Sequence, residues 1–332
     1  MAKKVTDTIA SKMGKVGRDL TNHIKDVNYA EVVKKVGDKV NTTASVVKST
    51  TQKVTQKASD AVVTFFDENG NGEVDIEDVI VKGLRLPGIR INREAFLRKE
   101  FFKLYDQSVI DDAIKNNPMH AGIKTEDIEK IANEVINYER NCVSGISAAL
   151  GMPGGAAMVA TIPADIAQYY GYLLRATQKL LYLYGFPEIN VDEEGSKFDS
   201  ETINILIICF GVMYGAAGAN NAIKAIAKAF ATGVERKLLK AALTKGTIYP
   251  IVKQVATWFG KKMTKEVFAG FFKKSIPVIG GIIGGGITFL SFKPCCIKLQ
   301  DSLKNTILSN KNYKEEQNNL LAIDAEYTEL SE

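Results

Sequence analysis

The residues best suited to chemistry lie close together, between Asp67 and Asp78. Read as a loop of twelve positions, this segment places oxygen-bearing side chains at positions 1, 3, 5, 9 and 12 and a glycine at position 6. EF-hand loops use this spacing to wrap oxygen ligands around Ca²⁺, with the backbone carbonyl of position 7 as a further ligand. We therefore predict a Ca²⁺ site, with Mg²⁺ as the alternative cation. Its predicted ligands are Asp67, Asn69, Asn71, Glu73, Asp75 and Asp78.

This loop departs from the usual EF-hand pattern in two respects. Asp78 stands at position 12, where a longer, bidentate glutamate is usual, and asparagines at positions 3 and 5 reduce the negative charge. Both changes weaken Ca²⁺ binding or favour Mg²⁺. The sequence shows no second loop of this kind, although EF-hands usually occur in pairs. An acidic turn that binds no ion is the competing interpretation.

Other kinds of catalytic or binding site find little support. The chain has only two histidines, His23 and His120, far apart in the sequence, and no P-loop. Asp165 lies in an apolar segment, where a buried carboxylate needs a partner. Because Asp165 closely follows Pro163, we interpret it as the N-cap of a helix. We predict no catalytic residues and expect a non-enzymatic protein; a site in which Asp165, Tyr169 and Arg175 converge is the minor alternative.

The elements around these residues are predicted to be helical, and three segments carry no charged side chain: 141–164, 202–223 and 275–292. Their lengths reach or approach the ~20 residues that span a bilayer. Prolines are expected to break the first segment at 153 and 163, asparagines and glycines are expected to interrupt the second, and Pro277 and several glycines the third. We therefore predict an all-α helical bundle with Gly/Ala-rich buried helices that pack closely. Insertion into a membrane, or docking on one, is the alternative.

The predicted bundle, residues 95–308, follows two segments of different character. Residues 1–64 form a basic amphipathic helical arm, in which apolar residues from Val5 to Val27 recur with an eleven-residue period. Residues 1–60 carry a net charge of +6, although the whole chain carries +5. Residues 65–94 contain the EF-hand-like loop and a connector, whose Lys82, Arg85, Arg90 and Arg93 are interpreted as solvated. A polar, acidic tail of residues 309–332 ends the chain.

Two sequence motifs resemble hallmarks of the EcsC family of bacterial proteins. Ile162-Pro-Ala-Asp-Ile166, followed by Arg175 and by Leu181-Tyr-Leu-Tyr-Gly-Phe186, is similar to one of them. The segment Ser275-Ile-Pro-Val-Ile-Gly-Gly-Ile-Ile-Gly-Gly-Gly286 is similar to the other. The resemblance covers roughly residues 95–305. It implies a mainly helical bacterial protein, of a family named for an operon that also encodes an ABC transporter linked to protein export. No catalytic residues can be carried over from this family.

Two functions are compatible with these features. The first is a non-enzymatic, EcsC-type protein that associates with an anionic membrane surface, peripherally or partly inserted, and carries the cation loop. The second is a soluble helical interaction or effector module that binds an apolar ligand or a protein partner. No nucleic-acid partner is expected, and the oligomeric state is left open. Because no apolar segment follows the Met-Ala-Lys-Lys start, we expect a cytoplasmic protein, at or near the inner face of the membrane.

Overall fold

The computed structural model describes most of the chain after residue 59. The predicted arm of residues 1–64 therefore lies almost wholly outside the described residues, as do most of the tail and the start of the third uncharged segment. All described residues belong to one compact unit, Gln56–Glu332. The described ranges are 60–67, 70–151, 155–189, 193–194, 197–234, 236–262, 280–310 and 313.

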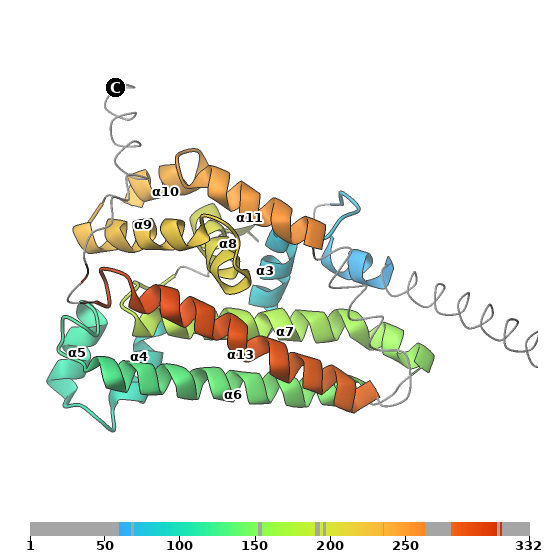
Figure 1. Cartoon of the computed structure of the whole chain (residues 1–332), viewed down its shortest axis with the longest axis horizontal. Helices are drawn as coiled ribbons and strands as arrows, with labels where there is room; N and C mark the ends of the chain where they lie inside the picture. Colours follow the sequence, from blue (N-terminus) through green and yellow to red (C-terminus); the bar gives the residue numbers. More distant parts are fainter. Residues whose placement is uncertain are drawn as a thin grey trace, which may run out of the picture. The chain divides into compact units, whose positions relative to one another are not determined.

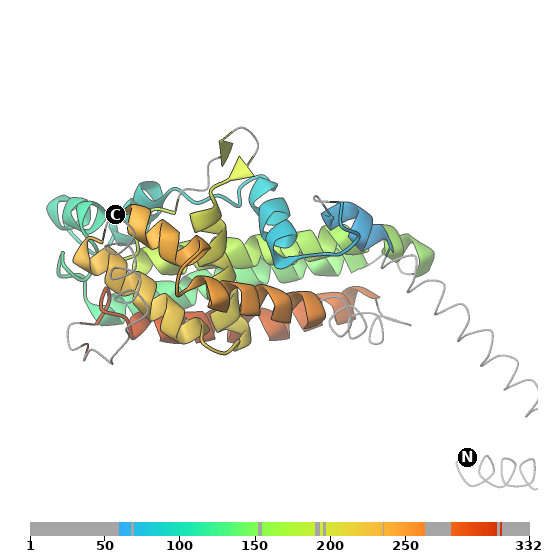
Figure 2. The ribbon, with the colours of Figure 1, turned by 90° about the horizontal axis from the view of Figure 1, so that it is seen from above.

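The regular secondary structure of the described residues is helical apart from one pair of two-residue antiparallel strands, so the predicted all-α bundle is confirmed (Figure 1). The strand pair lies at the edge of the molecule (Figure 2). The elements are α3 (Ile76–Arg85), α4 (Arg93–Phe101), α5 (Gln107–Lys115), α6 (Thr125–Gly151), α7 (Gly155–Leu183), β1 (Glu193–Glu194), β2 (Lys197–Phe198), α8 (Ser200–Tyr214), α9 (Ala219–Thr232), α10 (Arg236–Thr244), α11 (Tyr249–Lys262) and α13 (Gly280–Lys304).

Three long helices, α6, α7 and α13, run side by side along the longest axis of the molecule (Figure 1). Helix α6 has 27 residues and is about 40 Å long. Helix α13 is antiparallel to α6: Lys304 Nζ lies 3.0 Å from Glu129 Oε1 near one end, and Thr288 Oγ1 donates to Ser147 Oγ (3.2 Å) near the other. The uncharged C-terminal part of α6 and the uncharged N-terminal parts of α7 and α13 consequently meet at one end of the bundle.

The prediction that Pro163 breaks the first uncharged segment is wrong. Helix α7 continues through Pro163 to Leu183, and the break between α6 and α7 falls at residues 152–154, outside the described residues. A proline inside a helix removes one backbone donor. Here α6 supports α7 on both sides of it, because Thr161 Oγ1 donates to the Leu150 carbonyl (3.0 Å) and Ser147 donates to Asp165 (2.5 Å).

The second uncharged segment is broken as predicted, and its first half is deeply buried. Gly215 ends α8 and Gly218 precedes α9, both with a left-handed backbone (φ +76° and +80°) that glycine adopts without strain. A Cβ at Gly211 would lie 2.8 Å from a methyl of Val255 and 2.9 Å from Cβ of Ala219, so this glycine allows neighbouring helices to approach closely.

The interpretation of the connector as a set of solvated charges is wrong for Arg93. This side chain is buried, and it donates to the carbonyls of Phe186 (3.1 Å), Ile114 (2.6 Å) and Ala113 (3.3 Å). Arg93 therefore binds α4 to the ends of α5 and α7, because three carbonyl acceptors compensate for the loss of its hydration. Among the described helices, none is both long enough and apolar enough to cross a membrane.

Candidate functional site

The segment predicted to bind a cation has the helix–loop–helix arrangement that an EF-hand needs. Residues 60–66 are helical, and α3 begins at Ile76 with Asp75 as its N-cap. Gly70 and Gly72 have positive φ angles (+73° and +79°), so the loop turns sharply where the sequence predicted a turn. Buried Phe66 and Val74 anchor the loop to the core.

Asp67 closes the loop from its first position. Its Oδ1 accepts backbone N–H bonds from Gly70 (2.7 Å) and Asn71 (3.1 Å), and its Oδ2 accepts one from Gly72 (2.9 Å). Asn71 Oδ1 in turn accepts from the backbone N–H of Glu73 (2.8 Å). These bonds hold the loop in a tight curl and fix the side-chain oxygens at positions 1 and 5.

Asp78, at the last position, is the most perturbed acid of the loop. It is buried, and it accepts a hydrogen bond from the backbone N–H of Asp75 (3.2 Å). The pKa of Asp78 is raised to about 6, mainly by burial and also by the negative charges of Asp75, Asp67 and Glu77, while the hydrogen bond from the Asp75 backbone opposes the shift. A cation among these carboxylates would relieve that repulsion.

The structure brings together part of the predicted ligand set. Asn71 Nδ2 donates to Asp75 Oδ2 (3.3 Å), which joins positions 5 and 9, whereas Asn69 lies outside the described residues. Within the described ranges, no three His, Cys, Asp or Glu side chains converge as a metal-binding group. The residues of the loop thus fit a hard cation in type and order, and binding would require Asp67, Asp75 and Asp78 to draw closer together.

A second cluster of charges lies between α6 and α7, and the sequence did not reveal it. Glu139 is fully buried and accepts from Arg175 Nε (3.0 Å) and Lys179 Nζ (2.5 Å). Arg175 also donates to the carbonyl of Gly88 and so ties the connector to α7. The sequence did contain a signal that predicts burial of Glu139. This residue lies four positions from both Val135 and Val143, and this helical spacing places it on the buried face of α6.

Asp165 does not cap a helix, contrary to the sequence-based interpretation. It lies inside α7, and its partner is Ser147 of α6, which also receives the Thr288 hydroxyl of α13. Burial raises the pKa of Asp165, and the hydrogen bond from Ser147 opposes that shift. Asp165 and Arg175 have separate partners, because Arg175 pairs with Glu139. The minor enzymatic alternative therefore loses the convergence on which it rested.

The uncharged parts of α6, α7 and α13 meet at one end of the bundle, and we call residues 141–151, 155–164 and 280–292 the uncharged end. Residues 141–150, 161–164 and 288–292 of this end include both buried and exposed side chains. Two large apolar side chains of α13 are exposed there, Phe289 (42 %) and Leu290 (74 %). The guanidinium of Arg140, at the border of this surface, lies 3.9 Å from the centre of the Phe289 ring. The exposed surface is thus apolar with a cation at its edge.

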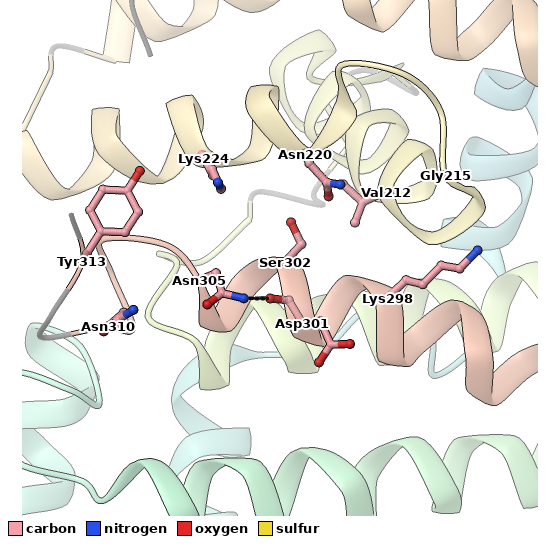
Figure 3. Close-up of a pocket in the computed structure, with 10 residues that line it drawn as sticks. All are labelled: Val212, Gly215, Asn220, Lys224, Lys298, Asp301, Ser302, Asn305, Asn310 and Tyr313. Carbon is pink, nitrogen blue, oxygen red and sulfur yellow. Dashed lines mark hydrogen bonds between the residues drawn. The ribbon is translucent and has the colours of Figure 1, made fainter. Parts of the chain in front are cut away.

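A polar cavity opens at the other end of α13, between this helix and α9 (Figure 3). Its lining comes from the end of α8, the first turns of α9, the last turns of α13 and the residues that follow. No single sequence segment contains it, so sequence reasoning missed it. The lining residues are Val212, Gly215, Asn220, Lys224, Lys298, Asp301, Ser302, Asn305, Asn310 and Tyr313.

Comparison with protein-family models, with curated proteins and with solved structures finds no match to this chain. The EcsC-like motifs fall on defined elements nevertheless. The first motif runs along α7 and ends just after Gly185. This position favours glycine, because its φ angle is +89° and a Cβ would lie only 3.0 Å from the carbonyl oxygen of Leu308. Residues 280–286 of the second motif belong to α13, and residues 275–279 lie outside the described residues.

Proposed function

We propose that this protein is a non-enzymatic, EcsC-type protein that binds an anionic membrane surface through its uncharged end. The observation that carries the proposal is the exposure of Phe289 and Leu290 beside Arg140. Apolar side chains edged by a cation suit the boundary between lipid headgroups and acyl chains. The basic residues 1–60 supply a second, electrostatic attraction to anionic lipid.

Neither attraction is sufficient alone. Burying one large apolar side chain contributes about 1.5–3 kcal/mol, and each Lys or Arg near an anionic surface contributes about 1 kcal/mol. Reversible binding to a membrane generally combines two such signals. We therefore expect binding that needs both anionic lipid and the exposed side chains of α13, and that weakens as salt screens the charges.

Flotation with liposomes tests the proposal. The full-length protein should float with vesicles that contain phosphatidylglycerol and should float poorly with pure phosphatidylcholine vesicles. The double variant Phe289→Ser/Leu290→Ser should lose most of the binding. Phe102→Ser is the matched control, because Phe102 is 70 % exposed and lies outside the uncharged end. A wild-type protein that stays in the soluble fraction with anionic vesicles would refute the proposal.

We also propose that the loop of residues 67–78 binds Ca²⁺, with Mg²⁺ as the alternative. The order of its oxygen side chains, its curled backbone and the mutual repulsion of its carboxylates support this assignment. Calorimetric titration should show heat with wild type and none with Asp67→Ala. Asp106→Ala, at the exposed N-cap of α5, is the control. Equal heats for wild type and Asp67→Ala would remove the claim.

Two further results would sharpen the cation assignment. Asp78→Glu restores the longer carboxylate that is usual at position 12, so it should raise Ca²⁺ affinity several-fold relative to Mg²⁺. Binding should weaken as the pH falls through about 6, because protonated Asp78 is a poor ligand. Affinity that is unchanged between pH 5 and pH 8 would exclude Asp78 as a ligand.

One observation favours the alternative of a soluble module with an apolar ligand. A mainly apolar cavity of about 320 Å³ lies between the end of α7 and helices α8 and α9, with Phe186, Ile205 and Phe230 in its lining. Cavities of this size and character hold small apolar molecules. A thermal-shift titration with benzene tests it: stabilisation that disappears in Ile205→Phe, which fills the cavity, would support an apolar ligand.

A further inference from the structure

The polar cavity between α9 and α13 has the dimensions and lining of a ligand site. It is open to solvent on one side and has a volume of about 570 Å³, within the range that small-molecule sites occupy. Helices α9 and α13 form its two long sides, and Val212 and Gly215 at the end of α8 lie at one end (Figure 3). Residues from four separate parts of the sequence thus surround one space that is large enough for a small metabolite.

The charged side chains of this cavity favour an anion. Lys224 extends from α9 toward α13, and Lys298 lies at the opposite end beside Gly215 (Figure 3). Asp301 is the acidic residue among the lining residues, and it is exposed at the rim. Two lysines against one aspartate leave an excess of one positive charge. The N-terminal turns of α9 and the C-terminal turns of α13 line the same space, so the opposite poles of two helix dipoles offset each other and the excess of positive charge comes from the side chains.

The hydrogen-bonding groups of this cavity favour a ligand that also carries hydroxyls. Ser302 Oγ is shielded from solvent and has no hydrogen-bond partner among the described residues, although it lies in the cavity lining opposite Asn220 (Figure 3). Asn305 is held in place by donating from Nδ2 to the carbonyl of Asp301 (2.7 Å). A buried hydroxyl without a partner costs free energy, so rotation of the Ser302 hydroxyl toward a ligand in the cavity would recover it.

We propose that this cavity binds a small phosphate-bearing polyol. Its phosphate would pair with Lys224, because an ammonium group is an effective point-charge partner for phosphate oxygens. Its hydroxyls would bond to Ser302 and to the amides of Asn220 and Asn305. The same chemistry occurs in a free sugar or glycerol phosphate and in the headgroup of a phospholipid. The site shares no residue with the uncharged end, so it stands or falls independently of the membrane proposal.

Calorimetric titration with sn-glycerol 3-phosphate tests the site in the full chain. Wild type should bind this probe and should not bind glycerol. Lys224→Met should weaken binding by at least about tenfold, because it removes a charge-assisted bond. Lys228→Met is the matched control: Lys228 is one turn further along α9, is also half-buried and does not line the cavity, so its affinity should stay within about twofold of wild type. Ser302→Val, which removes the hydroxyl at nearly constant volume, should also weaken binding.

Three results would overturn the proposal: wild type that gives no heat with sn-glycerol 3-phosphate, equal weakening by Lys224→Met and Lys228→Met, or unchanged binding in both Lys224→Met and Ser302→Val. Circular dichroism of each variant confirms that a loss of binding does not reflect unfolding.

Phosphatidylglycerol vesicles, added to the Phe289→Ser/Leu290→Ser chain, identify the source of the ligand. Competition with the probe would indicate a lipid headgroup, and no competition would indicate a free phosphorylated polyol; both results support the site.

Discussion

Residues 202–214 of α8 and the uncharged end of the long helices both lack charged side chains, but their surroundings differ. In α8, apolar side chains such as Leu206, Ile208 and Phe210 are fully buried, and α9, α10, α11 and α13 pack around the helix. At the uncharged end, Phe289 and Leu290 face outward. An uncharged segment that is enclosed by its own protein contributes to stability, whereas one that remains exposed is available to a partner.

The largest expected effect lies in α8. Phe210 is fully buried, and its ring lies 6.0 Å from that of Tyr170 and 6.1 Å from that of Phe259, measured between ring centres. Phe210→Ala should lower the free energy of unfolding by about 3–5 kcal/mol, because it leaves a cavity in a packed core. Urea unfolding monitored by circular dichroism measures this change. A loss below about 1 kcal/mol would mean that α8 is not the rigid core that its burial indicates.

A comparably large effect is expected where α6 passes from its charged part to the uncharged end. Glu139→Ala removes the partner of both Arg175 and Lys179 and should cost about 3–5 kcal/mol. Glu134→Ala, at an exposed position of the same helix, should change stability by no more than about 0.5 kcal/mol. Thermal unfolding of the two variants checks the contrast, and equal melting temperatures would show that the buried cluster is not structurally important.

A smaller effect, of opposite sign, is expected for Asp165 at the border of the uncharged end. Because burial raises its pKa, this carboxyl favours folding most below the ordinary pKa of Asp, near 4, and the free energy of unfolding falls as the pH rises through the raised value. Asp165→Asn should therefore raise the melting temperature at pH 7 and lose this advantage toward pH 4. Destabilisation at pH 7 would instead mean that the hydrogen bond from Ser147 stabilises the ionised carboxylate by more than burial destabilises it.

The smallest effect on stability is expected at Leu290. The change in the free energy of unfolding at this position can be compared directly with that of Phe210→Ala in α8. Leu290→Ser removes an apolar side chain that is 74 % exposed, so the free energy of unfolding should change by no more than about 0.5 kcal/mol. Urea unfolding beside Phe210→Ala provides the measurement. A loss above about 2 kcal/mol would show that Leu290 belongs to the core and is not available to a membrane.

Local sequence signals predicted the all-α fold, the break at Gly215 and Gly218, and the curl of the cation loop. These features depend on backbone preferences that short segments contain, such as a glycine where φ must be positive. The break at Pro163 was predicted wrongly, because contacts of Thr161 and Asp165 with α6 support the helix around the proline. The continuity of α7 through Pro163 therefore depends on tertiary packing, which a rule based on local sequence does not include. The prediction that glycines interrupt the third uncharged segment is also wrong for residues 280–292, because α13 contains them without a break.

The sites that sequence reasoning missed depend on contacts between distant residues. The Glu139 cluster joins residues 36 and 40 positions apart. The polar cavity draws on residues from Val212 to Tyr313. The antiparallel pairing of α6 with α13 placed Phe289 beside Arg140. The resemblance to EcsC proteins and the calcium assignment stay predictions, since they rest on motif patterns and not on a bound ion or a matched relative.

The most direct test uses the single tryptophan of the chain, Trp258. Trp258→Phe removes it, and Leu290→Trp then places the only tryptophan on the exposed turn of α13. With phosphatidylglycerol vesicles, we predict a blue shift of its emission and quenching by brominated lipid. Neither change should occur in the matched chain Trp258→Phe/Phe102→Trp. Emission at position 290 that is indifferent to vesicles, in a chain that remains folded, would contradict membrane binding through the uncharged end.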